Sequence, residues 1–394
     1  MKYAIITPTF EPHFKYITKY LKSFDTFVTD KDSIQVIFTI SQSERRSFFK
    51  IIKGYKHLNI TVLCFEEILS FFKIKETGEE LLEKYKKFTF QTLKKFYTML
   101  YVDADYFLVL DSESMWIKKT NMATLFEQYY KNPFLTYSSP KDREHFDIFS
   151  TAIRKNTDFL LGQKCEKWFL ENFVWFYDKK ILIDMCEKIG YPIQLAEKIK
   201  NLKNPHRLEW GIFEIELYQV FVYLNNDKYQ YKLIDAGAFL KEALPHTDYA
   251  KYRATFMKKF DGGCGILERT MSLLSETNYK ILGAFFKENN FSVIRCEESD
   301  FGNFDLQKKF IEIAQPSILA ASQEHAFGIN NPFIILSKKN GNLRNAFWHF
   351  KNWIHPIKAF FSWLLLEPVK IAYYTLRFGA SIVKHHKTFT PPVR

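Results

Sequence analysis

Short apolar runs alternate with segments of helical spacing along the N-terminal third of the chain, and this alternation is the strongest constraint on its fold. Runs rich in β-branched and aromatic residues predict four strands, at Lys2–Thr7, Ser33–Ile40, Asn59–Phe65 and Asp105–Leu110. Apolar residues at helical intervals predict helices between them, at His13–Phe27, Ser43–Gly54 and Phe88–Leu100. Strands that alternate with helices indicate βαβ units, so we expect an α/β fold with a mostly parallel sheet flanked by helices.

The rest of the chain has a less regular pattern. We expect Asn121–Asn225 to be largely helical. Further apolar runs predict strands, at Phe146–Ile153, Leu233–Phe239, Phe291–Cys296 and Phe333–Ser337. The chain has 394 residues, which is enough to bury a large core without disulfides or structural metals.

The cysteines and the N-terminal residues indicate in which cellular compartment the protein is expected. The five cysteines are odd in number and contain no CxxC pair, so neither a disulfide framework nor a zinc knuckle is expected. The first apolar run is too short for a signal peptide and is typical of a buried strand. We therefore expect a cytoplasmic protein.

Positive charge is concentrated at the C-terminus. The chain has a formal net charge of +12, and residues 341–394 hold eight Lys and Arg residues against one acid, Glu367. Between Asn345 and Leu366, apolar side chains recur at helical spacing with three tryptophans and several cations among them. This pattern is typical of an amphipathic helix in a membrane interface, although the same helix could dock on the rest of the chain. No apolar run is long enough to span a bilayer.

Two carboxylates, Asp111 and Glu113, follow the apolar run Asp105–Leu110, with one serine between them. Ligands of α/β folds bind outside the carboxyl ends of the parallel strands, so we expect both carboxylates in a crevice there. Carboxylate oxygens suit Mg²⁺ or Mn²⁺, which bridge to phosphate oxygens. The residues that end the first strand should face the same crevice.

An apolar strand followed by D-x-D or D-x-E, a short segment and a helix resembles the DxD motif of GT-A glycosyltransferases, such as those of bacterial capsule and lipopolysaccharide biosynthesis. The first strand, which ends at Thr7, Pro8 and Thr9, resembles the strand on which the base and ribose rest in that fold. The helix around Gln91–Phe96 and the strand before Asp111 resemble the elements that lead to the motif.

The resemblance implies a GT-A-like fold and a glycosyltransferase that uses a nucleotide-sugar donor with a divalent metal, Mn²⁺ or Mg²⁺. It implies that Thr7, Pro8, Thr9 and Asp111 contact the nucleotide, and that Asp111 and Glu113 ligate the metal. The third motif position is Glu113 rather than Asp, which leaves the metal preference open.

The resemblance also implies an order of parts along the chain. We expect a catalytic domain over residues 1–340, with a nucleotide-binding half over about 1–120 and an acceptor half over about 121–340, followed by the basic tail 341–394. A glycan or lipid-linked acceptor fits a peripheral position on the inner face of the plasma membrane. Nucleic acid is not an expected partner, because no helix-turn-helix, RNP or zinc pattern is present.

Glu214 and Glu216 are the candidates for a general base. They lie in the apolar segment Leu208–Leu224, which predicts a helix. The resemblance implies that an acidic residue on such a helix deprotonates the acceptor hydroxyl if the enzyme inverts. Because Glu214 and Glu216 are two residues apart on a helix, their side chains point to different sides of it. We favour Glu214 as the base.

Other candidates remain beside these. The resemblance implies a late histidine as a third metal ligand, and we favour His325, with His246 as its competitor. The glycine-rich segment Asp261–Gly265 predicts a loop, either a lid over the donor or a plain turn. A second D-x-D pair, Asp103 and Asp105, precedes the fourth predicted strand. We interpret Asp105 as a strand-entry residue and Asp103 as a helix-end or loop residue, and we keep the pair as the alternative motif.

Two other functions stay open. A sugar nucleotidyltransferase needs a phosphate loop rich in glycine and basic residues after the first strand, and Thr7–His13 lacks one. A non-catalytic membrane- or glycan-binding protein with a transferase-like fold would not bind nucleoside diphosphates.

Overall fold

The computed structural model describes residues 1–138, 148–171, 175–190, 211–250, 267, 270–295 and 304–320. All of these belong to the first of the two units into which the chain divides, Met1–Phe327.

A five-stranded sheet in the order β3-β2-β1-β4-β7 forms the centre of this unit. Its strands are β1 Tyr3–Pro8, β2 Gln35–Ile40, β3 Ile60–Cys64, β4 Tyr106–Val109 and β7 Phe176–Asp178. The first four run parallel, and β7 pairs with β4 in the antiparallel sense. Most positions of β1, β2 and β4 are buried, as expected for a sheet covered on both faces. The predicted α/β fold with a mostly parallel sheet is confirmed.

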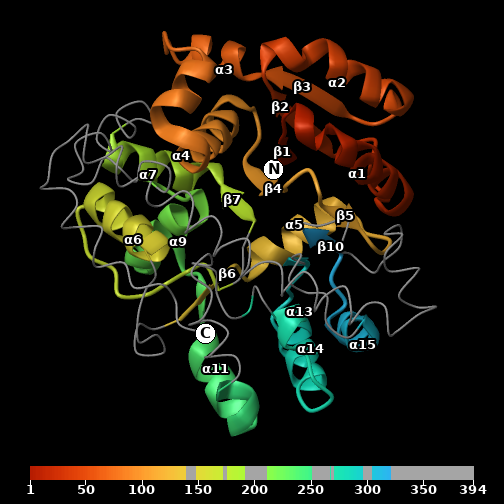
Figure 1. Ribbon diagram of the computed structural model, residues 1–394, viewed down its shortest axis with the longest axis vertical. Coiled ribbons are helices and arrows are strands. Elements are labelled where there is room, and N and C mark those ends of the chain that lie inside the picture. The colour runs from red at the N-terminus through yellow and green to blue at the C-terminus, as the bar shows by residue number, and fades with distance from the viewer. Residues whose placement is uncertain are drawn as a thin grey trace, which may run out of the picture. The chain divides into compact units, whose positions relative to one another are not determined.

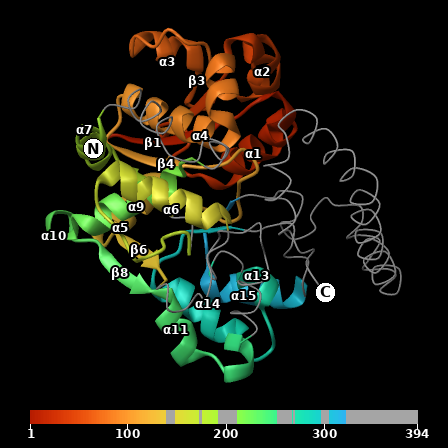
Figure 2. The same cartoon turned by 60° about the vertical axis from the view of Figure 1, so that its left-hand side comes forward.

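Helices cover both faces of the sheet. The pair α1 (Phe14–Phe27) and α2 (Arg45–Ile52) lies on one face, and α4 (Gly78–Tyr101) lies on the other (Figure 1; Figure 2). Right-handed crossovers require this division, because the chain moves outward from β1 to β3 and then returns to β4 on the other side of β1. Tyr20 of α1 packs edge-on against Trp116, with 5.0 Å between the ring centroids.

The remaining elements complete the unit around this sheet. The other described helices are α3 Phe65–Phe71, α5 Met122–Lys131, α6 Ile148–Leu161, α7 Lys179–Ile189, α9 Glu214–Leu224, α10 Asn226–Tyr229, α11 Ala236–Ala243, α13 Thr270–Leu273, α14 Tyr279–Glu288 and α15 Phe304–Ala314. The other described strands are β5 Met115–Trp116, β6 Phe134–Tyr137, β8 Lys232–Asp235, β9 Val293–Arg295 and β10 Ile318–Ala320. Strands β6 and β8 form a parallel pair, and β5, β10 and β9 form a small sheet in that order.

Helices α14 and α15 pack closely against one another beside the small sheet. The approach is tightest at Gly283 of α14, where a Cβ atom would lie 2.8 Å from both Cβ and Cγ2 of Ile313. Glycine therefore allows the side chain of Ile313 in α15 to pack directly against the backbone of α14.

One predicted strand was wrong. Phe146–Ile153 was expected to be extended, but helix α6 begins at Ile148 and includes most of that run. The side chains of Ile153, Thr157 and Leu160 are buried, which is helical spacing. The helical spacing of buried residues continues beyond Ile153 to Leu160. The run Phe146–Ile153 alone was too short to show this spacing, and it therefore suggested a strand.

Other predictions around this region were partly correct. The strand predicted at Leu233–Phe239 ends early, because the Asp235 carboxylate accepts a hydrogen bond from the amide three residues on and begins α11. Within Asn121–Asn225, predicted as largely helical, β6 and β7 were missed. The strand predicted at Phe291–Cys296 is confirmed by β9, and Phe333–Ser337 lies outside the described residues.

Candidate functional site

The turn that carries Asp111 and Glu113 lies beside the end of β1. Ile6 pairs with Val109, and the amide of Leu110 donates to the carbonyl of Ile6 at 2.9 Å. The chain that leaves β4 therefore runs next to the chain that leaves β1. The expected meeting of the two strand ends at one edge of the sheet is confirmed.

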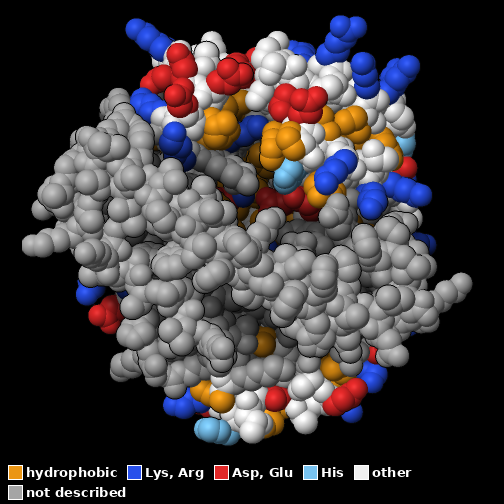
Figure 3. Space-filling view, viewed as in Figure 1, with side chains coloured by type: hydrophobic (Ala, Val, Ile, Leu, Met, Phe, Trp, Pro, Cys, Tyr) orange, Lys and Arg blue, Asp and Glu red, His pale blue; other side chains and the backbone are white. Residues whose placement is uncertain are grey.

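Glu113 is held by a histidine and by its own neighbour. Nδ1 of His13 lies 3.0 Å from Oε1 of Glu113, and the hydroxyl of Ser112 donates to Oε2 at 3.1 Å. Burial acts to raise the pKa of Glu113, but the contacts with His13 and Ser112 outweigh it and lower that pKa below its usual value. Figure 3 shows acidic side chains beside a histidine in a hollow of one face. Sequence reasoning missed His13, since a single histidine before a helix forms no motif.

Lys95 of α4 connects Asp111 to Glu214. Its ammonium donates to Oε1 of Glu214 and lies 3.8 Å from Oδ1 of Asp111. The hydroxyl of Thr92 donates to the other oxygen of Glu214 at 2.9 Å. The side chains of Lys95 and Glu214 are 11% and 3% exposed, whereas that of Asp111 is 37% exposed. The ion pair is therefore inside the protein, and Asp111 extends from it toward solvent.

The charges around Asp111 shift one another's protonation. Burial acts to lower the pKa of Lys95, but the carboxylates of Glu214 and Asp111 raise it above its ordinary value. Burial raises the pKa of Asp111, and the cations of Lys95 and Arg295 act against that rise. Arg295, at the end of β9, thus acts on Asp111 from the small sheet. Three carboxylates, two cations and a histidine meet here from five separate segments.

The end of β1 offers a buried hydroxyl. The side chain of Thr7 is turned inward, with 2.8 Å between its hydroxyl and that of Tyr20. Thr9 is also buried, and its hydroxyl has no hydrogen-bond partner among the residues that the structure describes. Its carbonyl accepts a hydrogen bond of 3.1 Å from Nζ of Lys94. Contact of Thr7, Pro8 and Thr9 with a nucleotide stays a prediction, for which Thr9 has a side-chain donor available.

The two glutamates of α9 point to different surroundings, as their spacing predicts. Both lie in the first turn of the helix and both are buried. Glu214 contacts Lys95, whereas Oε2 of Glu216 accepts a hydrogen bond of 3.0 Å from the amide of Phe169. Negative charge is favourable at this end of a helix. The role of either residue as a general base stays a prediction, and Glu214 is the one connected to Asp111.

The alternative motif lies at the opposite end of β4. Asp103 is 89% exposed and pairs with the ammonium of Lys2 at 2.5 Å. Asp105 accepts a hydrogen bond from the amide of Lys2 at 2.8 Å, immediately before β4 begins. Asp103 lies between the end of α4 and β4, and Asp105 directly precedes β4, so the interpretation of the two residues as loop and strand entry is confirmed. His246, the competing histidine, is exposed just after α11.

Several predicted features lie outside the described residues, namely His325, Asp261–Gly265 and the tail 341–394. In the part of the chain that is described, no helix is both long and apolar enough to cross a membrane. In the same part, no group of three or more His, Cys, Asp and Glu side chains is placed to hold a metal ion.

Comparison with known proteins gives distant structural similarities. No protein-family model and no curated protein sequence matches the chain. The structure is similar to mouse xyloside xylosyltransferase 1 in its apo form, with 8% identity, 61% of this chain and 86% of that chain covered, and a TM-score of 0.32. It is also similar to the glycosyltransferase GlyE of Streptococcus pneumoniae TIGR4, with 12% identity, 66% and 50% coverage, and a TM-score of 0.31.

A third similar structure is the mannosyltransferase PcManGT from Pyrobaculum calidifontis in complex with GDP-Man and Mn²⁺. The identity is 11%, the coverage 48% of this chain and 47% of that chain, and the TM-score 0.26. This chain thus spans about half the length of GlyE and of PcManGT. Roles for individual residues are inferred below from the geometry of the site and not from these similarities.

Proposed function

We propose that this chain is a metal-dependent glycosyltransferase that moves a sugar from a nucleotide-sugar donor to a glycan or lipid-linked acceptor. The observation that carries the proposal is the meeting of Asp111 and Glu113 with Lys95 and Arg295 at the carboxyl end of β4, beside β1. A nucleoside diphosphate needs cations around its oxygens, and carboxylates that can share a metal with it. This edge of the sheet supplies both.

The donor set fits a divalent metal that is shared with the substrate. Mg²⁺ and similar ions are commonly held by one or two carboxylates together with substrate phosphates and water. Asp111 and Glu113 would be these two carboxylates, so a third protein ligand is not required. A bound divalent ion supplies charge that neutralises the diphosphate as it leaves.

The remaining charged residues would act on the same leaving group. Lys95 and Arg295 would attract the diphosphate electrostatically, because both cations lie close enough to Asp111 to act on its charge. Glu214 would hold Lys95 in place through the buried ion pair. If the enzyme inverts, the acceptor hydroxyl also needs a base, and Glu214 remains our candidate ahead of Glu216.

The measurement that tests the proposal is a thermal-shift titration with UDP, GDP, CMP and dTDP, each with and without Mn²⁺ or Mg²⁺. A ligand that binds only the folded chain stabilises it by about 3 kcal/mol at a hundred times its Kd. We expect one nucleotide to raise the midpoint in a metal-dependent way, and the double variant Asp111→Ala/Glu113→Ala to lose that shift.

The matched control is Asp103→Ala/Asp105→Ala, which removes the other D-x-D pair at the far end of β4. It should keep the nucleotide shift. If no nucleotide stabilises the wild type with either metal, the transferase proposal fails and a non-catalytic binding protein takes its place. If the control variant loses the shift and the Asp111 variant keeps it, the site is at the wrong end of the strand.

We also propose that the protein acts at the inner face of the plasma membrane in surface-glycan assembly. The support is the sequence of residues 341–394, with its excess of cations and with three tryptophans in a segment whose apolar residues recur at helical spacing. Deleting these residues should move the protein from the membrane fraction to the soluble fraction. Unchanged fractionation would contradict membrane binding by the tail, without bearing on the nucleotide site.

A further inference from the structure

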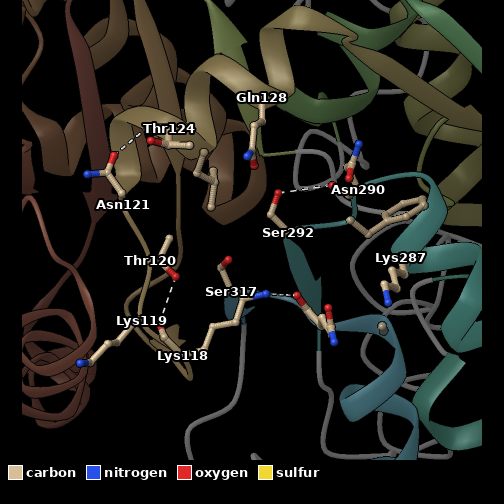
Figure 4. Close-up of a pocket in the computed structure, with 14 residues that line it drawn as sticks. Lys118, Lys119, Thr120, Asn121, Thr124, Gln128, Lys287, Asn290, Ser292 and Ser317 are labelled. Carbon is tan, nitrogen blue, oxygen red and sulfur yellow. Dashed lines mark hydrogen bonds between the residues drawn. The ribbon is translucent and has the colours of Figure 1, made fainter.

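A second cavity lies at the beginning of β9 and β10, and we call it the lysine pocket. Its volume is about 450 Å³, within the range of small-molecule sites. The connection from β5 to α5, the first turns of α5, the end of α14 and the start of β9 and β10 form its walls (Figure 4). Lys118, Lys119 and Lys287 are among the residues that line it.

The lysine pocket is separate from the Asp111 site, and the small sheet shows how. Arg295 ends β9 and pairs with Ala320 at the end of β10. Ser292 and Ser317, which line the pocket, precede the same two strands. The pocket therefore lies at the start of both strands, whereas Arg295, whose charge acts on Asp111, lies at the end of β9.

The lining of this pocket carries positive charge that no acid opposes. Of the described residues that line it, three are lysines and none is Asp or Glu. Lys118 donates to the carbonyl of Gln315. In the described part of the chain, no carboxylate forms an ion pair with Lys119 or Lys287, and both side chains are exposed. Their charges are available to an anion.

The attraction for an anion comes from these lysines rather than from the start of α5. The Asp30 carboxylate already accepts hydrogen bonds from the amides of Met122 and Ala123, at 2.8 and 2.9 Å. The side chain of Asn121 accepts from the amide of Thr124 at 2.9 Å. The first amides of α5 therefore already have hydrogen-bond acceptors, and the Asp30 carboxylate is bound to two of them.

Uncharged polar groups complete the lining. Figure 4 shows Gln128 from α5 opposite Asn290 and Ser292 from the segment before β9. Asn121 and Ser317 also belong to the lining. Amides and hydroxyls of this kind bind the hydroxyl groups of a polyol and the free oxygens of a phosphate.

We propose that the lysine pocket binds a phosphate ester whose remaining part is polar. Lysine ammonium groups bind phosphate as point charges, and the three lysines that line this cavity offer at least as much positive charge as a phosphate monoester carries negative charge. The amides and hydroxyls then suit a polyol such as a sugar. The phosphate can come from a soluble sugar phosphate or from a lipid headgroup, and the experiment separates these two sources.

The test uses the full chain in EDTA, so that no metal is available to the Asp111 site. Glucose 6-phosphate, glycerol 3-phosphate and glucose are titrated by calorimetry. Glycerol 3-phosphate presents the headgroup of a phospholipid without a membrane surface, so the basic tail 341–394 has no membrane to bind. The pocket variant is Lys119→Ala/Lys287→Ala. The charge-matched control is Lys50→Ala/Lys53→Ala, two exposed lysines around the end of α2.

We expect the pocket variant to bind a phosphate-bearing probe at least about tenfold more weakly than wild type, since it lacks two of the ammonium groups that can form charge-assisted hydrogen bonds with the phosphate. The control should bind like wild type, and glucose should not bind. Weaker binding of glucose 6-phosphate by the pocket variant identifies a soluble sugar phosphate, whereas weaker binding of glycerol 3-phosphate alone identifies a headgroup. The proposal is overturned if wild type binds neither probe, if both double variants behave alike, or if glucose binds as well as its phosphate. All four lysines are exposed, so thermal midpoints near that of wild type will confirm that the variants fold.

Discussion

Buried charge is the main feature at the scale of single residues. A lysine and a glutamate that are each largely removed from water remain charged only because they face one another. In the Lys95–Glu214 pair, Thr92 occupies the second oxygen of the glutamate, and Asp111 adds a more distant negative charge for the lysine. The pair is thus both a part of the candidate site and a structural requirement of the fold around it.

Replacing Glu214 with Gln should therefore destabilise the protein as well as affect the site. The variant leaves the ammonium of Lys95 buried with Asp111 as its nearest remaining negative charge, which should lower the free energy of unfolding by about 3 kcal/mol. Urea unfolding measures this. Glu67→Gln is the control, because its pair with Arg45 is exposed on both sides and should contribute below about 0.5 kcal/mol. Equal effects of the two substitutions would show that the buried pair does not stabilise the fold.

Lys94 gives a prediction about pH. Burial lowers its pKa from 10.5 to about 8, although Glu44 and Glu66 act to raise it. Below pH 8 the lysine is protonated in both states, and the folded state bears the cost of burying the charge. Between about 8 and 10.5 only the unfolded chain keeps the proton, so the contribution of Lys94 to stability rises with pH.

Lys94→Met removes this titration and keeps most of the side-chain volume. The stability of the variant relative to wild type should be greatest below pH 8, where wild type bears the cost of the buried charge. This advantage should shrink by up to about 3 kcal/mol as the pH rises from 8 to 10.5. Urea unfolding of both proteins at several pH values measures it. The other titrating groups are common to both chains, so parallel pH profiles would mean that the pKa of Lys94 is not lowered.

At the scale of elements, the contact between α14 and α15 depends on a residue without a side chain. Gly283→Ala would place a methyl group 2.8 Å from two carbons of Ile313 and 3.3 Å from the carbonyl of Phe310. Separating the helices should cost about 1–3 kcal/mol, partly offset by the higher helix propensity of alanine, about 1 kcal/mol.

We therefore expect Gly283→Ala to lower the free energy of unfolding by about 1 kcal/mol, as measured by denaturant titration. Gly54→Ala is the control, because no atom lies within 4 Å of the position that its Cβ would take. A control that is destabilised as much as Gly283→Ala would remove the steric explanation. The effect should be local to the small sheet, since α14 and α15 pack beside it.

At the scale of the whole molecule, the sequence predicted the central sheet well and the surrounding elements less well. Strands β1 to β4 are apolar runs separated by clear helical patterns, so local periodicity was sufficient. Strand β7 has three residues, Phe176–Asp178, and its place beside β4 is set by pairing across the sheet. A helix such as α6 begins inside a run that resembles a strand, and only later residues reveal its period.

The candidate site likewise contains some residues that the sequence predicted and some that it did not. Asp111 and Glu113 could be found from sequence because they follow a strand, and Glu214 because it begins an apolar helix. His13, Lys95 and Arg295 could not, since an isolated cation has no pattern until the fold brings it to a carboxylate. Charges that complete a site from distant segments are visible only in three dimensions.

The Lys95–Glu214 pair also has a consequence for biosynthesis. The two residues are 119 positions apart, so the ribosome produces the lysine, and Asp111 after it, long before the glutamate. Throughout that interval the nascent chain contains an ammonium group destined for the interior without the carboxylate that will hold it there. The N-terminal strands can be synthesised early, but this part of the crevice is completed only when α9 leaves the ribosome.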